Sequence, residues 1–229
     1  MTADRRLAIG CVGLLLCAQL LYAQPGPRYR QFQLGGDLSS VSALTGVAVS
    51  EVKTVHERPA LIQELQWRLP YAATASSALA ADPVRQIAFS FFSDQLFRIV
   101  IDYELERTKG MTDADMIEAI SSAYGAMSEM PDASLDSSQT AQESWRAVAR
   151  WGDADASVVL YRSSYGSAFR MIVTSLPLDA LARAAAAEAV RLDERDAPSR
   201  ETARQQKVAD DARAAQEKAR LANKAGFRP

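Results

Sequence analysis

Apolar and polar residues alternate with a period of two along much of the chain, the pattern of half-buried β-strands. The pattern is clearest at residues 87–101, which read as a strand, a short turn and a second strand. Residues 159–173 repeat this order, and both copies resume after the turn with Phe-Arg and then apolar residues (Phe97-Arg98 and Phe169-Arg170). The sequence therefore predicts two related β-hairpins.

The alternation also predicts how each hairpin turns. A two-residue turn in the first hairpin would place Arg98 on the same face as Phe89 and Phe91, whereas a three-residue turn at residues 93–95 places Phe97 there instead. Burial of each large apolar side chain stabilises a fold by about 1.5–3 kcal/mol, so we expect the three-residue turn. The same register in the second hairpin groups a matching apolar set: Val159, Tyr161, Phe169, Met171 and Val173.

Helical spacing of apolar residues predicts a short helix ahead of each hairpin. Asp37 caps the first expected helix, which ends at Gly46. Thr112 caps the second, which runs to Tyr124 and ends at Gly125. Alternating segments predict further strands at residues 29–34, 47–56, 61–67 and 145–151.

These elements predict an α+β fold of two tandem helix-plus-antiparallel-sheet units followed by C-terminal helices. We expect the first unit at residues 28–110 and the second at residues 111–176. Pro198 interrupts the C-terminal helical pattern, and residues 198–229 carry many charges and few large apolar residues, as in a charged helical or disordered tail. Residues 177–197 are expected to dock on the sheet through an apolar stripe: Leu178, Leu181, Ala185, Ala189 and Leu192.

The N-terminal segment has the pattern of an export signal. Arg5 and Arg6 precede an uncharged apolar run at residues 7–23, and a Pro/Gly-rich break follows at residues 24–27. We expect residues 1–23 to be a cleaved signal peptide and the mature protein to be secreted or periplasmic. The alternative is a retained membrane anchor, although a bilayer span usually needs about 20 apolar residues.

Cysteine usage and charge limit the chemistry expected of the mature chain. Both cysteines, Cys11 and Cys17, lie in the expected signal peptide, so we expect no disulfide, no cysteine nucleophile and no thiolate metal site. The formal net charge of −2 indicates no nucleic-acid partner. A membrane partner is expected only if the N-terminal segment is retained.

Potential metal or acid–base groups in the sequence have simpler interpretations. The single histidine, His56, precedes Glu57, but no nucleophile motif accompanies the pair, which favours a surface histidine beside a turn. Asp113, Asp115 and Glu118 could ligate a cation, but helix capping accounts for the first two. We therefore expect no cofactor and no metal ion.

Three carboxylates alternate along one strand and form the enzymatic alternative. Asp102, Glu104 and Glu106 fall on one face, where they could act as an acid/base pair in sugar chemistry. A solvated strand end is the simpler interpretation. An exported hydrolase that uses Asp102 with Glu104 or Glu57 remains the rival to a non-enzymatic protein.

The hairpin faces turned away from the aromatic core combine arginine with apolar residues, and the tryptophans are further candidates for this face. A half-apolar sheet face with arginine and tryptophan is typical of protein-binding surfaces. The alternative is that the C-terminal helix or the other unit covers this face. The candidate binding residues are Phe92, Arg98, Val100, Arg162, Arg170, Trp67 and Trp151.

Residues 32–46 combine a strand, a glycine turn and a short helix that ends in glycine: Phe32, Leu34, Gly35, Gly36, Asp37, Val41, Leu44 and Gly46. This order resembles the opening of SmpA/OmlA-type envelope α+β domains, and two such units in tandem resemble β-lactamase inhibitory protein-like folds. The resemblance covers residues 29–176 and implies an antiparallel sheet whose face binds another protein. The chain lacks the lipidated cysteine of the first group and the disulfides of the second.

Together these observations predict an exported, non-enzymatic module that binds another envelope or secreted protein or helps to organise the envelope. The alternatives are the carboxylate-dependent hydrolase and a membrane-anchored version of the same domain.

Overall fold

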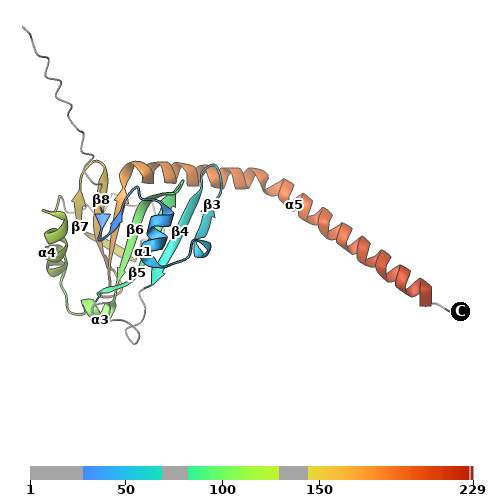
Figure 1. The fold of residues 1–229 in the computed structure, drawn as a ribbon, viewed down its shortest axis with the longest axis horizontal. Helices are drawn as coiled ribbons and strands as arrows, with labels where there is room; N and C mark the ends of the chain where they lie inside the picture. Colours follow the sequence, from blue (N-terminus) through green and yellow to red (C-terminus); the bar gives the residue numbers. More distant parts are fainter. Residues whose placement is uncertain (1–27, 69–81, 129–143, 227, 229) are drawn as a thin grey trace, which may run out of the picture.

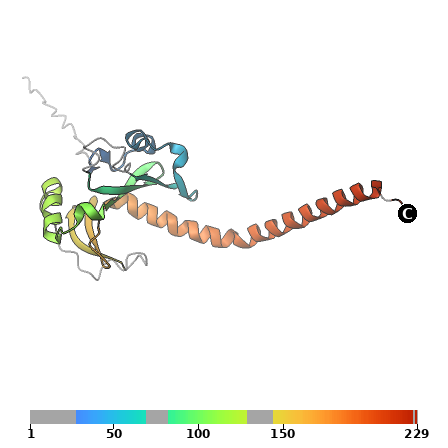
Figure 2. The same cartoon turned by 90° about the horizontal axis from the view of Figure 1, so that it is seen from below.

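The computed structural model describes residues 28–68, 82–128, 144–226 and 228. A central β-sheet lies between small elements on one face and a long helix on the other (Figures 1 and 2). We call these faces the core face and the outer face. The α+β class predicted from the sequence is confirmed. The expected signal peptide, residues 1–23, lies outside the described residues.

Within the described residues, seven strands form one antiparallel sheet in the order β3-β4-β5-β6-β9-β8-β7. The first hairpin is β5–β6 and the second is β8–β9, and β6 pairs with β9, so both hairpins belong to one continuous sheet. The strands are β1 (Arg28–Tyr29), β2 (Phe32–Gln33), β3 (Lys53–His56), β4 (Ile62–Arg68), β5 (Val84–Phe92), β6 (Gln95–Tyr103), β7 (Trp145–Gly152), β8 (Ala156–Ser163) and β9 (Phe169–Ser175).

Capping signals in the sequence explain where the short helices begin and end. Asp37 accepts a hydrogen bond from the backbone N–H of Ser40, and Thr112 and Asp115 form a capping box, so both expected helix starts are confirmed. Gly46 ends its helix at a φ of 72°, which favours glycine. The helices are α1 (Leu38–Thr45), the 3-10 helix η1 (Val49–Glu51), α3 (Leu105–Thr108), α4 (Asp113–Tyr124) and α5 (Leu176–Gly226).

The first hairpin turns on two residues, Ser93 and Asp94, and the expected three-residue turn is wrong. Phe91 pairs with Leu96 and Ser90 pairs with Arg98, so Phe97 is an extra residue without a partner on β5, that is, a β-bulge. The bulge, and not the turn, makes the number of residues odd. Leu96 therefore joins the aromatic core. Phe97 is buried outside that core, so its expected place beside Phe89 is also wrong.

The second hairpin has no matching bulge, and its expected register is wrong by one residue. Val158 pairs with Val173, and Leu160 pairs with Met171 on the core face. Val159 and Tyr161 alternate with these residues and are buried outside the core cluster. Because side chains alternate along a strand, a bulge in one copy alone makes equivalent residues of β5 and β8, such as Phe89 and Tyr161, face opposite sides, whereas Arg98 and Arg170 in the following strands share the outer face.

The core lies between the core face and the short helices. Phe32 from β2 packs on Phe89 from β5, with ring centroids 4.6 Å apart. Val41 from α1 and Met116 and Ile120 from α4 are buried in the same cluster. Each short helix thus buries one apolar stripe against the sheet, and each large side chain contributes about 1.5–3 kcal/mol.

Helix α5 continues for 51 residues. Pro198, expected to interrupt it, lies inside the helix, where it removes one backbone donor. The side chain of Arg200 donates a hydrogen bond to the backbone carbonyl of Asp193, two turns earlier and on the other side of Pro198. Figure 2 shows the helix bending along its length, as expected for a helix that contains proline.

Only the first part of α5 packs on the sheet, and every residue from Ala197 to Gly226 is exposed. The expected docking stripe is right for Ala185 and Ala189 but wrong for Leu181, which is 54% exposed. Small side chains face the sheet and allow a close approach of the helix backbone. The buried residues of α5 are Asp179, Ala182, Ala185 and Ala189.

Candidate functional site

Outer-face side chains form rows that cross the strands of the sheet. Helix α5 begins directly after β9 and packs on β9, β6 and β5, over the row that contains Arg98. The next rows lie two and four residues further along each strand, about 7 and 13 Å from the Arg98 row. A helix is about 10–12 Å wide and extends about half of that to each side of its axis, so these rows lie beside α5. We name these rows the apolar row, Ala88, Val100 and Ile172, and the charged row, Arg68, Gln86, Asp102 and Arg170.

Arg98 holds α5 on the sheet. Its guanidinium forms an ion pair with Asp179, which is 4% exposed, and Arg183 of α5 pairs with the same carboxylate. Phe92 is half-buried at the same end of the sheet, where it pairs with Ile62. Helix α5 therefore lies over this row of the sheet, as in the alternative that the sequence left open, while the Arg98 side chain stays 27% exposed.

Arg170 lies four residues further along the sheet and has a different environment. Its Nε donates to the carboxylate of Asp102, which is 4% exposed, and Gln86 donates to the other carboxylate oxygen at 2.8 Å. The Arg170 guanidinium also stacks on the indole of Trp145, 4.4 Å from the ring centroid. The buried carboxylate and the indole fix the arginine in a partly exposed position.

The apolar row lies between α5 and the charged row. Ala88, Val100 and Ile172 occupy adjacent strands at one level and are each half-buried. We use the term open patch for this row together with the charged row, Arg85 and Trp145. The patch combines partly exposed aliphatic groups with arginine and tryptophan.

The remaining predicted binding residues lie elsewhere. Arg162 belongs to the core side, where it pairs with Asp113 of α4 at 2.7 Å and stacks on Phe169. The expected place of Arg162 beside Arg170 on one face is therefore wrong. The cause is the bulge-free register of the second hairpin, which moves every β8 side chain to the face opposite the expected one.

Two of the predicted tryptophans are also absent from the open patch. Trp151 is 1% exposed and donates its indole N–H to Ser121 of α4, so its expected outer position is wrong. Trp67 packs its edge on Phe32 at the margin of the core. The third tryptophan, Trp145, lies in the open patch. A bulge between Ala147 and Ala149 explains why alternation along β7 does not predict which face of the sheet each of its tryptophans occupies.

The acidic residues of α4 have structural partners. Asp113 accepts hydrogen bonds from Arg162 and Arg146, and Asp115 caps the helix through Thr112. Partial burial opposes ionisation of Asp113, but the arginine hydrogen bonds outweigh it and lower the pKa of the carboxyl. Among the described residues, no cluster of three or more His, Cys, Asp or Glu side chains can hold a metal ion.

In the part of the chain that the structure describes, none of the carboxylates of the enzymatic alternative lines the groove beside β4. Asp102 is engaged by Arg170 and Gln86, and Glu104 follows β6 and precedes α3. Glu57 follows β3, three strand spacings from β6 or about 14 Å, whereas glycosidase carboxyl pairs lie about 5–9.5 Å apart. His56 is half-buried at the end of β3.

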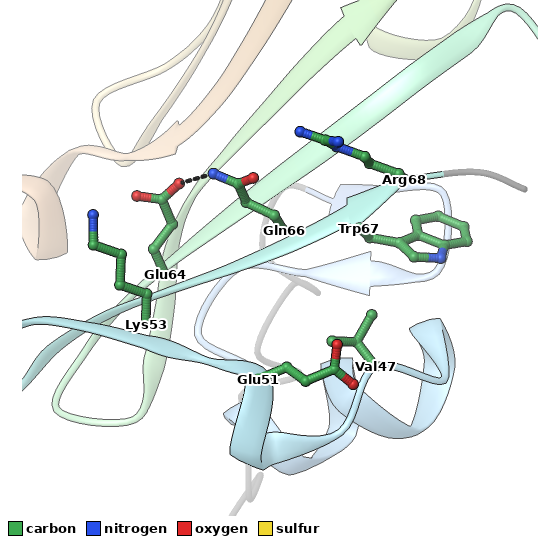
Figure 3. A pocket seen from close by; sticks show the side chains of 7 residues that line it. All are labelled: Val47, Glu51, Lys53, Glu64, Gln66, Trp67 and Arg68. Atoms are coloured by element: carbon green, nitrogen blue, oxygen red, sulfur yellow. Dashed lines mark hydrogen bonds between the residues drawn. The ribbon is translucent and has the colours of Figure 1, made fainter.

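A groove of about 520 Å³ lies where β3 begins alongside β4 (Figure 3). β3 pairs with β4 only between His56 opposite Ile62 and Lys53 opposite Glu64, so residues 65–68 of β4 pair with β5 on one side and have no strand on the other in the described chain. Figure 3 shows Trp67 on one side of β4 and Gln66 and Arg68 on the other. The groove therefore adjoins the charged row.

Comparison of this chain with protein-family models, with curated proteins and with solved structures finds no match. In the part of the chain that the structure describes, no helix is both long enough and apolar enough to cross a bilayer.

Proposed function

We propose that this protein is an exported, non-enzymatic module that binds another envelope or secreted protein through the open patch. The observation that carries the proposal is the Arg170 side chain, which a buried carboxylate and an indole hold in place beside half-buried aliphatic residues. Arginine and tryptophan are enriched among residues that dominate binding energy, and an ordered arginine loses less conformational entropy when a partner binds.

We also infer that the single sheet joins two tandem units, residues 28–110 and 111–176. Each unit supplies a capped short helix followed by a hairpin, and the units meet where β6 pairs with β9. In this arrangement the join lies in the middle of the outer face, so residues of both units form the open patch.

Site-specific photocrosslinking in the producing cell tests the proposed role. A photoreactive phenylalanine analogue replaces Arg85, whose side chain is 59% exposed at the patch, and in a control it replaces Arg213, 79% exposed near the end of α5. We expect one partner to crosslink at position 85 and not at position 213. Equal crosslinking at both positions, or none at position 85, would contradict the proposal.

The identified partner is then purified and its affinity measured. Trp145→Ala removes the stacking surface under Arg170 and should weaken binding about tenfold or more, because central aromatic anchors carry much of an interface energy. Arg213→Ala should leave the affinity unchanged. Screens of the purified mature chain on glycosides, esters and peptides should show no turnover, and activity abolished by Asp102→Asn would establish the hydrolase instead.

The exported location has its own test. N-terminal sequencing of the protein recovered from the envelope or medium should give a start near Gln24. Recovery of the intact N-terminus in the membrane fraction would support the anchored alternative.

A further inference from the structure

The open patch and the adjoining groove carry more positive than negative exposed charge. Arg68, Arg85 and Lys53 are exposed, and Arg170 is partly exposed. Neither Arg68 nor Lys53 forms an ion pair with any described residue. Arg85 lies 3.8 Å from the Asp102 carboxylate and stays 59% exposed. These four cations lie in the same region as three carboxylates, Asp102, Glu64 and Glu51, so the local excess is four minus three, one positive charge.

The acidic side chains in this region already have partners. Asp102 is buried and accepts hydrogen bonds from Arg170 and Gln86. Glu64 accepts a hydrogen bond from Gln66 at 3.1 Å, as Figure 3 shows. Glu51 lies across the groove from these residues, where its carboxylate accepts from the backbone N–H of Ala48. The donors to Glu64 and Glu51 are neutral, so both carboxylates keep their charge, and the excess of positive charge lies at Arg68 and at Arg85 beside Arg170.

The arrangement of the cations matches an extended ligand. Arg68 and Arg170 belong to the same row and are separated by three strand spacings, about 14 Å. Arg85 is the extra residue of a bulge between Val84 and Gln86, which directs its side chain toward this row. Guanidinium groups bind carboxylates through paired hydrogen bonds, and the apolar row beside them can take alternate aliphatic side chains.

We propose that the open patch and the groove beside β4 bind an acidic segment of the partner protein, in which carboxylate and aliphatic residues alternate. This inference rests on the proposed protein-binding function and specifies the chemistry of the partner. Carboxylates of the segment pair with Arg68, Arg85 and Lys53, and its aliphatic side chains lie on Val100 and Ile172.

The probe is a fluorescein-labelled peptide of alternating glutamate and valine, and its matched control alternates lysine and valine. Binding to the purified mature chain is measured by fluorescence anisotropy. We expect the acidic peptide to bind and the basic peptide not to bind. Raising the salt from about 50 to 300 mM should weaken the interaction, because exposed charge pairs are screened.

The paired variant Arg68→Ala/Arg85→Ala tests the location of this site. It leaves the Asp102–Arg170 ion pair intact, so the fold should be preserved, and circular dichroism checks this. Affinity for the acidic peptide should fall about tenfold or more, since each cation contributes charge-assisted hydrogen bonds. The control Arg191→Ala/Arg213→Ala removes the same charge from exposed positions of α5 and should have no effect.

Charge reversal provides a gain of function. Arg68→Glu/Arg85→Glu should bind the lysine–valine peptide in preference to the glutamate–valine peptide. The inference is wrong if the two peptides bind the unmodified chain equally, or if both paired alanine variants lose affinity alike. Crosslinking at position 85 without binding of the acidic peptide would contradict this inference and would still support the proposed function. Binding of the acidic peptide without any crosslinked protein would contradict the proposed function and would support the preference of the open patch for acidic ligands.

Discussion

Arg98 and Arg170 occupy the same position in the repeated Phe-Arg motif, yet the structure gives them different roles. Each pairs with an aspartate that is 4% exposed, Asp179 for Arg98 and Asp102 for Arg170. Asp179 comes from α5, so its ion pair holds a helix on the sheet. Asp102 comes from the neighbouring strand β6, so that pair stays within the sheet, beside Trp145. The two arginine side chains are almost equally exposed, 27% for Arg98 and 29% for Arg170, so the origin of the counter-charge decides whether the arginine docks a helix of its own chain, not how much of it solvent reaches.

The largest expected effect is at the ion pair that docks α5. Asp179→Ala removes a buried carboxylate that both Arg98 and Arg183 contact, and should lower the free energy of unfolding by about 2–3 kcal/mol. Urea denaturation followed by circular dichroism measures the change. Asp210→Ala, on the exposed part of α5, is the control and should lie within about 0.5 kcal/mol of the unmodified chain. Equal stability of the two variants would mean that the ion pair does not hold the helix.

A smaller loss of stability is expected at Arg170, whose ion pair stays within the sheet. Arg170→Ala leaves Asp102 with the hydrogen bond from Gln86 and with Arg85 nearby, so the loss should be about 1–2 kcal/mol. The same denaturation experiment applies, with Arg191→Ala as the exposed control. A loss greater than that of Asp179→Ala would reverse the comparison and identify Arg170 as the main structural arginine.

The ion pairs of Asp113 extend the comparison to the core side and predict a dependence on pH. The pKa of Asp113 is lowered in the folded state, so its contribution is present above the ordinary aspartate pKa and is lost as the pH falls through the folded pKa. Asp113→Asn should cost about 1 kcal/mol at pH 7. The difference from the unmodified chain should shrink below about pH 4 in denaturation curves. A difference that grew on acidification would contradict the ion-pair role.

The smallest effect is expected at the exposed end of α5. Deletion of residues 199–229 removes only side chains exposed in the described part of that segment, so the Tm should change by about 1–2 °C at most. Deletion of residues 177–229 also removes Asp179 and the buried alanines and should destabilise the domain markedly. If the two truncations had the same Tm, the docking of α5 would contribute nothing to stability.

Local patterns in the sequence determined the elements of this fold. The caps at Asp37 and Thr112, the glycine at the end of α1 and the alternation of the hairpins are each specified by neighbouring residues, and the structure contains them. The α+β class follows from these local signals. The candidate surface was predicted in part: Arg170 and Val100 lie in the open patch, whereas Arg98 lies under α5.

The tertiary structure alone decided which face each strand presents. A β-bulge shifts every later side chain by one position, and the bulge at Phe97 is hidden because Leu96 and Phe97 are both apolar and either could enter the core. The absence of a bulge in β8–β9 moved Arg162 to the core side. The path of α5 depended on Asp179, whose buried charge is favourable only when Arg98 lies opposite, and that pairing joins residues far apart in the chain.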